Sequence, residues 1–109
     1  MIVHRIVLQN PPALEDLVSP AGMGEHPPTG DPRVARLWEG ISVFRTMQQA
    51  RNRALRSTHL GSYIAVLDLV ESGPIQCERT GLTRGHYTVW GDPVALLAAV
   101  VNVVPVREL

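Results

Sequence analysis

Apolar runs separated by turn-forming residues divide the chain into short elements. Thr46 and Gln49 form a capping box, which predicts a helix from there to about Ser57. The Asp-Pro pairs at 31–32 and 92–93 predict short helices at about 32–38 and 93–100, because aspartate caps a helix and proline suits its first position. Runs rich in β-branched and aromatic residues predict strands at 2–8, 41–44, 62–70, 75–78, 86–90 and 102–106.

The order of these elements indicates the fold class. Most of the strands gather after the second helix, which favours an α+β fold. We expect one domain, residues 1–109, built on a small, twisted, largely antiparallel sheet with about three short helices. Pro105 has no backbone N–H to donate to a neighbouring strand, so it predicts an edge or terminal position for the last strand.

A Pro/Gly-rich loop at about 9–30 separates the first strand from the first helix. Its five prolines and three glycines exclude a long regular element, although residues 13–18 suit one or two helical turns. A loop of this length in a small domain is typical of a lid, a binding loop or a segment that becomes ordered on a partner protein. It also carries the acidic residues Glu15, Asp16 and Glu25.

Composition is that of a globular domain, with 45% apolar and 18% charged residues. The single cysteine permits no intrachain disulfide and no cluster of soft metal ligands, so we expect a reducing compartment and no metal. Neither a signal peptide nor a membrane-spanning run is present, which predicts a cytoplasmic protein without membrane association. Ten basic residues balance ten acidic ones, so no overall field attracts nucleic acid.

The basic residues are all arginine, and the arginine-rich helix 45–56 contains no acid. Helical periodicity puts Arg45, Arg53 and Arg56 on its polar side, whereas Arg51 falls within the apolar arc. Such a face can bind phosphates through charge-assisted hydrogen bonds. It can equally be a solvated face neutralised by the acidic loop, with the stem of Arg51 covering apolar surface.

Polar side chains also interrupt the apolar strands, at His4, Arg5, Ser42 and Tyr63. Buried polar groups need partners, so these residues either make structural hydrogen bonds or line a cleft. We expect positions 4, 5, 42 and 86 to converge on one shared hollow.

The strand HYTVW, residues 86–90, carries a second group of candidates. Alternation places His86 on the same face as Trp90 and opposite Tyr87, and an imidazole near a strand end can act as acid, base or phosphate ligand. Glu71 and Glu78 flank the turn that follows the strand 62–70; they form either a solvated pair or a pair that includes one catalytic acid.

Several stretches together resemble a known family. A first strand with HRIV, a proline-rich loop, the run WEGISVFRTMQQARNRA and the strand YIAVLDL resemble small bacterial domains of the ADP-ribosyltransferase-like fold. The RES-type toxins, which degrade or use NAD, are one such group. The resemblance covers about the first 70 residues.

This resemblance implies roles for matching residues. Arg5 or His4 would hold the phosphates of NAD, and Ser42 or Phe44 would belong to the second motif. Phe44 or Tyr87 would stack on nicotinamide.

The acidic residue found in the resembling domains has a less clear counterpart in this sequence. Glu71 or Glu78 would be the nearest acids, and the helix acid of RES domains is absent, with Arg51 and Arg53 in that neighbourhood.

Two hypotheses follow. The first is an NAD-using, ADP-ribosyltransferase-like enzyme or toxin, with catalytic candidates Ser42, Glu78 and His86 and cofactor-binding candidates His4, Arg5, Phe44, Arg51 and Tyr87. The second is a non-enzymatic module that binds an anionic ligand or a protein through the arginine-rich helix 45–56.

Overall fold

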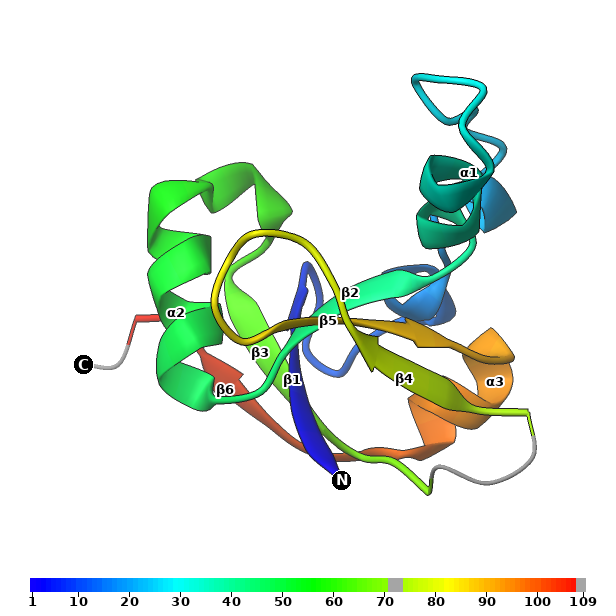
Figure 1. The fold of residues 1–109 in the computed structure, drawn as a ribbon. Helices are drawn as coiled ribbons and strands as arrows, with labels where there is room; N and C mark the ends of the chain where they lie inside the picture. The colour runs from blue at the N-terminus through cyan, green and yellow to red at the C-terminus, as the bar shows by residue number, and fades with distance from the viewer. Residues whose placement is uncertain (71–73, 108–109) are drawn as a thin grey trace.

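The computed structural model describes residues 1–70 and 74–107. Its strands are β1 (Ile2–Val7), β2 (Ile41–Phe44), β3 (Tyr63–Asp68), β4 (Gln76–Arg79), β5 (His86–Trp90) and β6 (Val100–Pro105). Its helices are α1 (Pro32–Trp38), α2 (Met47–Arg56) and α3 (Pro93–Ala98), with 3-10 turns η1 (Leu14–Leu17), η2 (Ala21–Met23) and η3 (Thr58–Leu60). The strands form one antiparallel sheet in the order β4-β5-β2-β1-β3-β6, which confirms the predicted α+β class (Figure 1).

The predicted helix starts are confirmed by their caps. Asp31 and Asp92 each accept a hydrogen bond from the backbone N–H two residues later, at 2.9 and 3.1 Å. At the start of α2, the Thr46 hydroxyl accepts from the Gln49 N–H at 3.1 Å, and the Gln49 side chain accepts from the Thr46 N–H at 3.2 Å. These local signals position α2 directly after β2.

The predicted boundary between the last helix and the last strand was wrong. The sequence predicted a helix to residue 100, whereas α3 ends at Ala98 and β6 begins at Val100. Val100 pairs with Leu67 of β3, so this β-branched residue extends the sheet instead of the helix. Pro105 lies in β6, which is an edge strand as predicted.

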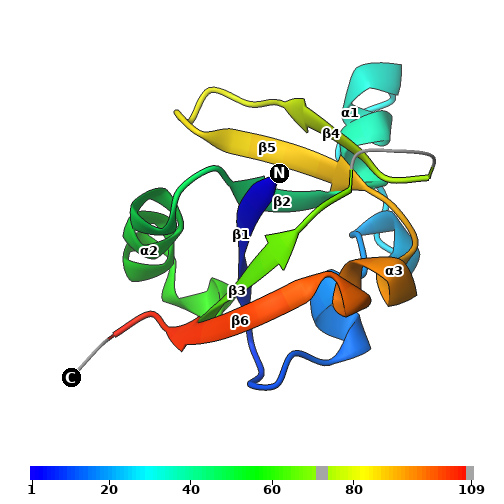
Figure 2. The ribbon, with the colours of Figure 1, turned by 90° about the horizontal axis from the view of Figure 1, so that it is seen from below.

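Each face of the sheet buries its own apolar cluster. One cluster includes Leu17 of η1 and Leu96 of α3. The other lies beneath α2, where the small side chains of Ala50 and Ala54 pack with Phe44 of β2. Figure 2 shows α2 and α3 well separated, at opposite ends of the sheet.

The first half of the 9–30 loop is part of the folded domain. Leu17 and Asp16 are buried, with 1% and 7% of their surfaces exposed, whereas residues 21–26 are exposed. The 3-10 turn η1 accounts for the helical turn predicted near residues 13–18, and η2 is a second turn that was not predicted.

The sheet is nearly divided between β1 and β2. β1 pairs with β3 at six positions and β2 pairs with β5 at four, but β1 and β2 are paired only at His4 and Phe44. Continuing that register would set Ile6 opposite Ser42, and the two strands diverge before they reach that pair. This divergence opens the sheet at its centre.

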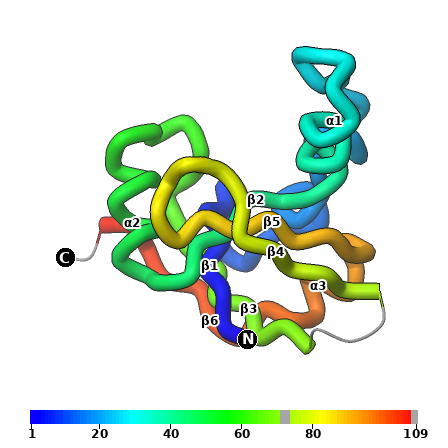
Figure 3. The backbone as a smooth tube through the Cα atoms, in the orientation of Figure 1, coloured from blue at the N-terminus to red at the C-terminus, as the bar shows by residue number. Residues whose placement is uncertain are grey.

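The connection 80–85 lies beside α2. It joins β4 to β5 and is the wide yellow loop in Figure 3. Gly85 accepts a backbone hydrogen bond from Arg45 at 2.9 Å, and a Cβ at this glycine would collide with the side chain of Gln49. The close approach fixes this connection against the start of α2.

Candidate functional site

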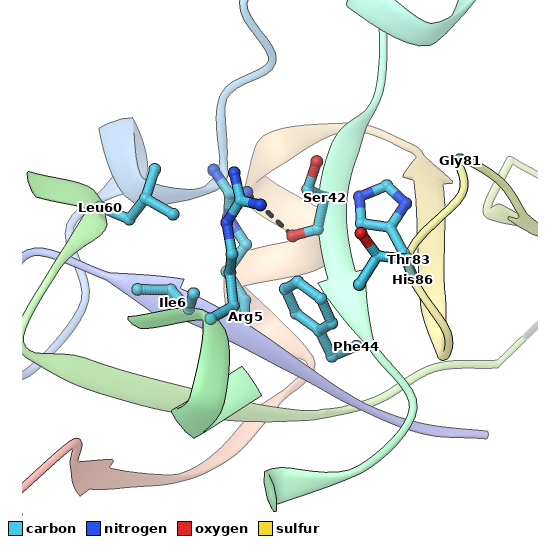
Figure 4. A pocket seen from close by; sticks show the side chains of 9 residues that line it. Arg5, Ile6, Ser42, Phe44, Leu60, Gly81, Thr83 and His86 are labelled. Carbon is cyan, nitrogen blue, oxygen red and sulfur yellow. Dashed lines mark hydrogen bonds between the residues drawn. The ribbon is translucent and has the colours of Figure 1, made fainter. Parts of the chain in front are cut away.

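A groove opens where β1 and β2 diverge, and its larger part has a volume of about 360 Å³. We call this part the first compartment. Figure 4 shows Arg5 on one side of Ser42 and His86 on the other. The polar and aromatic lining comes from β1, β2, α2, β5 and the 80–85 connection, and it consists of Arg5, Ser42, Phe44, Arg53, Thr83 and His86.

Arg5 bridges the opening between the two strands. Its Nε donates to the Asp16 carbonyl at 3.0 Å and its Nη1 donates to the Ser42 carbonyl at 2.9 Å. Burial lowers the pKa of Arg5 to about 10, and the Asp16 carboxylate opposes this shift. The guanidinium therefore remains a cation at neutral pH. Three of its five N–H groups make no hydrogen bond with the part of the chain that the structure describes.

The Asp16 side chain fixes the loop whose backbone binds Arg5. Its carboxylate accepts the backbone N–H of Leu8 at 2.8 Å and that of Ala13 at 3.0 Å. Sequence reasoning placed Asp16 only within an acidic loop and did not connect it with Arg5. No local signal could have connected them, because the contact depends on η1 packing against β1.

His86 has one ring nitrogen committed to the protein. Its Nδ1 lies 3.0 Å from the Thr80 carbonyl and 3.2 Å from the Thr80 hydroxyl, which in turn lies 2.6 Å from the Thr88 hydroxyl. A carbonyl oxygen can only accept, so Nδ1 carries the proton. In the neutral ring Nε2 then carries a lone pair, which suits it to act as a base or acceptor.

Gly81 lets the connection pack on this imidazole. It has φ +74°, and a Cβ there would lie 3.3 Å from His86 Nδ1. Phe44 supports the ring from below, with the two ring centres 5.5 Å apart in an edge-to-face arrangement. The Ser42 side chain is exposed at the same place. His86 is therefore held in one orientation in the lining of the groove.

A second compartment of about 340 Å³ adjoins the first. The two share Arg5, Ser42, Gly81 and His86. The additional walls of the second compartment come mainly from the loop before α1, from α1 and from the polar pair beneath His86, namely Pro20, Leu37, Trp38, Thr80 and Thr88.

Positions 4, 5, 42 and 86 were expected to line one hollow. The structure brings positions 5, 42 and 86 together in the groove, but not position 4. His4 is buried, and its Nδ1 donates to the Phe44 carbonyl at 3.2 Å. Burial lowers the pKa of His4, against the effect of that hydrogen bond. Alternation does not explain this difference, because His4 shares its face of β1 with Ile6, which lines the groove, whereas Arg5 shares its face with Val3 and Val7 and enters where β1 and β2 diverge.

Two other candidates lie away from the groove lining. Tyr87 packs against the cluster under α3, on the opposite face from His86. Glu78 on β4 makes a two-pronged ion pair with Arg36, at 3.0 and 3.1 Å. Arg36 also stacks on Trp90, with its Cζ 3.9 Å from the ring centre. Glu71 lies outside the described residues.

The arginines of the predicted basic helix point in different directions. Arg45 donates to the Ile2 carbonyl at 2.8 Å, and Arg51 donates to the Val106 carbonyl at 2.9 Å. Arg53 lines the first compartment, and Arg56 is exposed. Arg53 is thus the cation of α2 that faces the groove. Periodicity placed it on the polar side, but its neighbours there were not predictable.

Comparison of the chain with protein-family models, with curated proteins and with solved structures gave no match. Within residues 1–70 and 74–107, no helix is long and apolar enough to cross a bilayer. In the same residues, no three His, Cys, Asp or Glu side chains are grouped so that they could hold a metal ion.

Proposed function

We propose that the groove binds NAD and that the chain is an ADP-ribosyltransferase-like enzyme, of the kind found among RES-type toxins. The observation that carries this proposal is the convergence of Arg5, Ser42, Phe44 and His86 on one groove. They come from three strands that are distant in sequence. The first three are residues to which the resemblance assigns cofactor binding or the second motif.

Charge supports a phosphorylated ligand. Arg5 is a fixed cation with three N–H groups left for a ligand, and Arg53 adds a second positive charge to the same lining. A guanidinium in a partly desolvated site forms strong, two-pronged hydrogen bonds with phosphate oxygens. The pyrophosphate of NAD would therefore lie across Arg5 and Arg53.

The remaining lining suits the nucleoside part. The compartment volume falls within the range of small-molecule sites, and Phe44, Ile6 and Leu60 provide apolar surface beside the cations. Phe44 would contact the nicotinamide ring. We propose no such role for Tyr87, which lies on the opposite face. His4 and Arg51 would act through the fold, because both hydrogen-bond to the backbone elsewhere.

The alternative, an anion-binding module without chemistry, would use the arginine-rich helix 45–56 through Arg53, which lines the first compartment, and the exposed Arg56. It differs from the enzyme in one measurable respect: it binds nucleotides or other anions but releases no nicotinamide from NAD. Its binding would also weaken steeply with salt, because exposed arginines are screened.

Nicotinamide release from NAD tests the proposal. The wild-type chain should release nicotinamide, and NAD should raise its thermal unfolding midpoint. Arg5→Gln keeps an N–H donor at the position of Nε, toward the Asp16 carbonyl, but removes the charge and both Nη groups, so NAD affinity should fall roughly 10- to 100-fold. Arg56→Gln, which removes an exposed arginine outside the groove lining, is the matched control and should behave as wild type. Absence of nicotinamide release by the wild type, or full activity in a folded Arg5→Gln variant, would refute the enzyme.

A further inference from the structure

We propose that the second compartment receives the acceptor of the ADP-ribosyl group, and that this acceptor is a hydroxyl group deprotonated by His86. The inference rests on the proposed function, because it takes NAD in the first compartment as the donor.

The two compartments meet at the reacting groups. They share Arg5, Ser42, Gly81 and His86, so a ligand in one lies directly beside a ligand in the other. A donor held at Arg5 would present its ribose near this junction. An acceptor must then approach from the other compartment.

The state of His86 selects the chemistry of the acceptor. Its Nδ1 is bound to Thr80, and its Nε2 has a lone pair and no hydrogen bond within the described part of the chain. A hydroxyl acceptor must lose its proton as it attacks, and a positioned imidazole removes it. A carboxylate acceptor would need no base. A guanidinium acceptor would meet the positive charge of Arg5.

The walls of the second compartment indicate the rest of the acceptor. Leu37, Trp38 and Pro20 offer apolar surface, and none of the described residues that line the compartment carries a carboxylate. The indole N–H of Trp38 is buried without a hydrogen-bond partner in residues 1–70 and 74–107. A buried hydrogen-bond donor without a partner lowers stability, and an oxygen of the bound alcohol within hydrogen-bond distance would provide that partner. A neutral alcohol with an apolar body fits this combination.

The step balances without a further reactant. The bond between ribose C1′ and the nicotinamide nitrogen breaks, and its electron pair leaves with neutral nicotinamide. The acceptor oxygen forms the new bond to C1′. Its proton passes to His86 Nε2 and from there to solvent.

Three acceptors that share a phenyl ring test the inference: benzyl alcohol, benzylguanidine and benzoate. Each is incubated with the protein and NAD, and ADP-ribosylated products are measured by mass spectrometry. We expect product from benzyl alcohol and none from the other two. Calorimetric titration with NAD alone reports the donor site separately.

Two variants locate the effect. His86→Asn retains a donor toward the Thr80 carbonyl but lacks Nε2, so the rate of alcohol transfer at saturating NAD should fall by about 10²-fold or more, a loss that weaker NAD binding alone would not produce. Trp38→Leu removes the indole N–H and part of the wall, and it should lower transfer to benzyl alcohol without lowering NAD affinity. Thermal melts establish that both variants are folded.

The outcomes separate the two proposals. If the wild type fails to bind NAD, the proposed function and this inference both fail. A second case is that NAD is bound and nicotinamide is released. In that case this inference alone is overturned by any of three results: benzylguanidine or benzoate is the preferred acceptor, water is the only acceptor used, or His86→Asn keeps full transfer.

Discussion

Replacing Asp16 by asparagine tests how the groove is built. The side chain is 7% exposed, and its two carboxylate oxygens accept the N–H groups of Leu8 and Ala13 at 2.8 and 3.0 Å. Asparagine has the same shape but only one acceptor oxygen. Whichever way its amide turns, one backbone N–H faces an NH2 group instead of an oxygen.

The expected cost follows from that mismatch. One charge-assisted hydrogen bond is lost and one largely buried donor is left unpaired, which together lower the free energy of unfolding by about 2–3 kcal/mol. The neighbouring Glu15→Gln is the control, because Glu15 is exposed and such changes usually stay within about 0.5 kcal/mol. Urea denaturation measures both values, provided that unfolding is two-state.

Asp16→Asn should also weaken ligand binding in the groove. The Asp16 carbonyl holds Arg5 Nε at 3.0 Å, so loosening η1 releases one of the two contacts that orient the guanidinium. NAD affinity should therefore fall in Asp16→Asn and not in Glu15→Gln. An Asp16→Asn variant as stable as the wild type would refute this description of the loop.

Two further predictions concern stability. Leu17→Ala should lower the free energy of unfolding by about 2–5 kcal/mol, because Leu17 is 1% exposed in the cluster under α3. The control Leu14→Ala, at a position 42% exposed, should lower it by at most about 1 kcal/mol in the same urea assay. Equal effects would mean that η1 is not packed as described. The second prediction concerns pH, because burial lowers the pKa of His4 below its ordinary 6.5. Below pH 6.5 the unfolded chain therefore binds a proton at His4 more readily than the folded chain does. The free energy of unfolding should fall as the pH drops through 6.5, and the contribution of His4 should be fully present at higher pH. His4→Asn, which keeps a donor toward Phe44, should reduce that slope and His59→Asn should not; an unchanged slope in His4→Asn would contradict the assignment.

Local features of the fold were predictable because they depend on neighbours in sequence. The capping box at Thr46 and Gln49 and the Asp-Pro helix starts depend on residues two or three apart, and the structure confirms them. Val100 was misassigned because its pairing with Leu67 comes from a strand far away in the chain.

The groove was predictable only in part. Polar residues in apolar strands marked Arg5, Ser42 and His86 as unusual, and these three do line it. Alternation could not show that β1 and β2 separate after a single pair, which is what lets Arg5 enter.

Two other contacts between distant segments were not predictable. Glu78 is held by Arg36, which is 42 positions away, and Trp38 comes to the second compartment from α1. Neither contact leaves a pattern in the local sequence.

The most direct test of the central claim is an NMR titration of the isotope-labelled protein with NAD. The account predicts that amide signals of Arg5, Ser42, Gly81 and His86 shift together and saturate with one dissociation constant, because these residues surround the junction of the two compartments. Shifts confined to the exposed side of α2 around Arg56, or no shifts at NAD concentrations well above the cellular range, would contradict it.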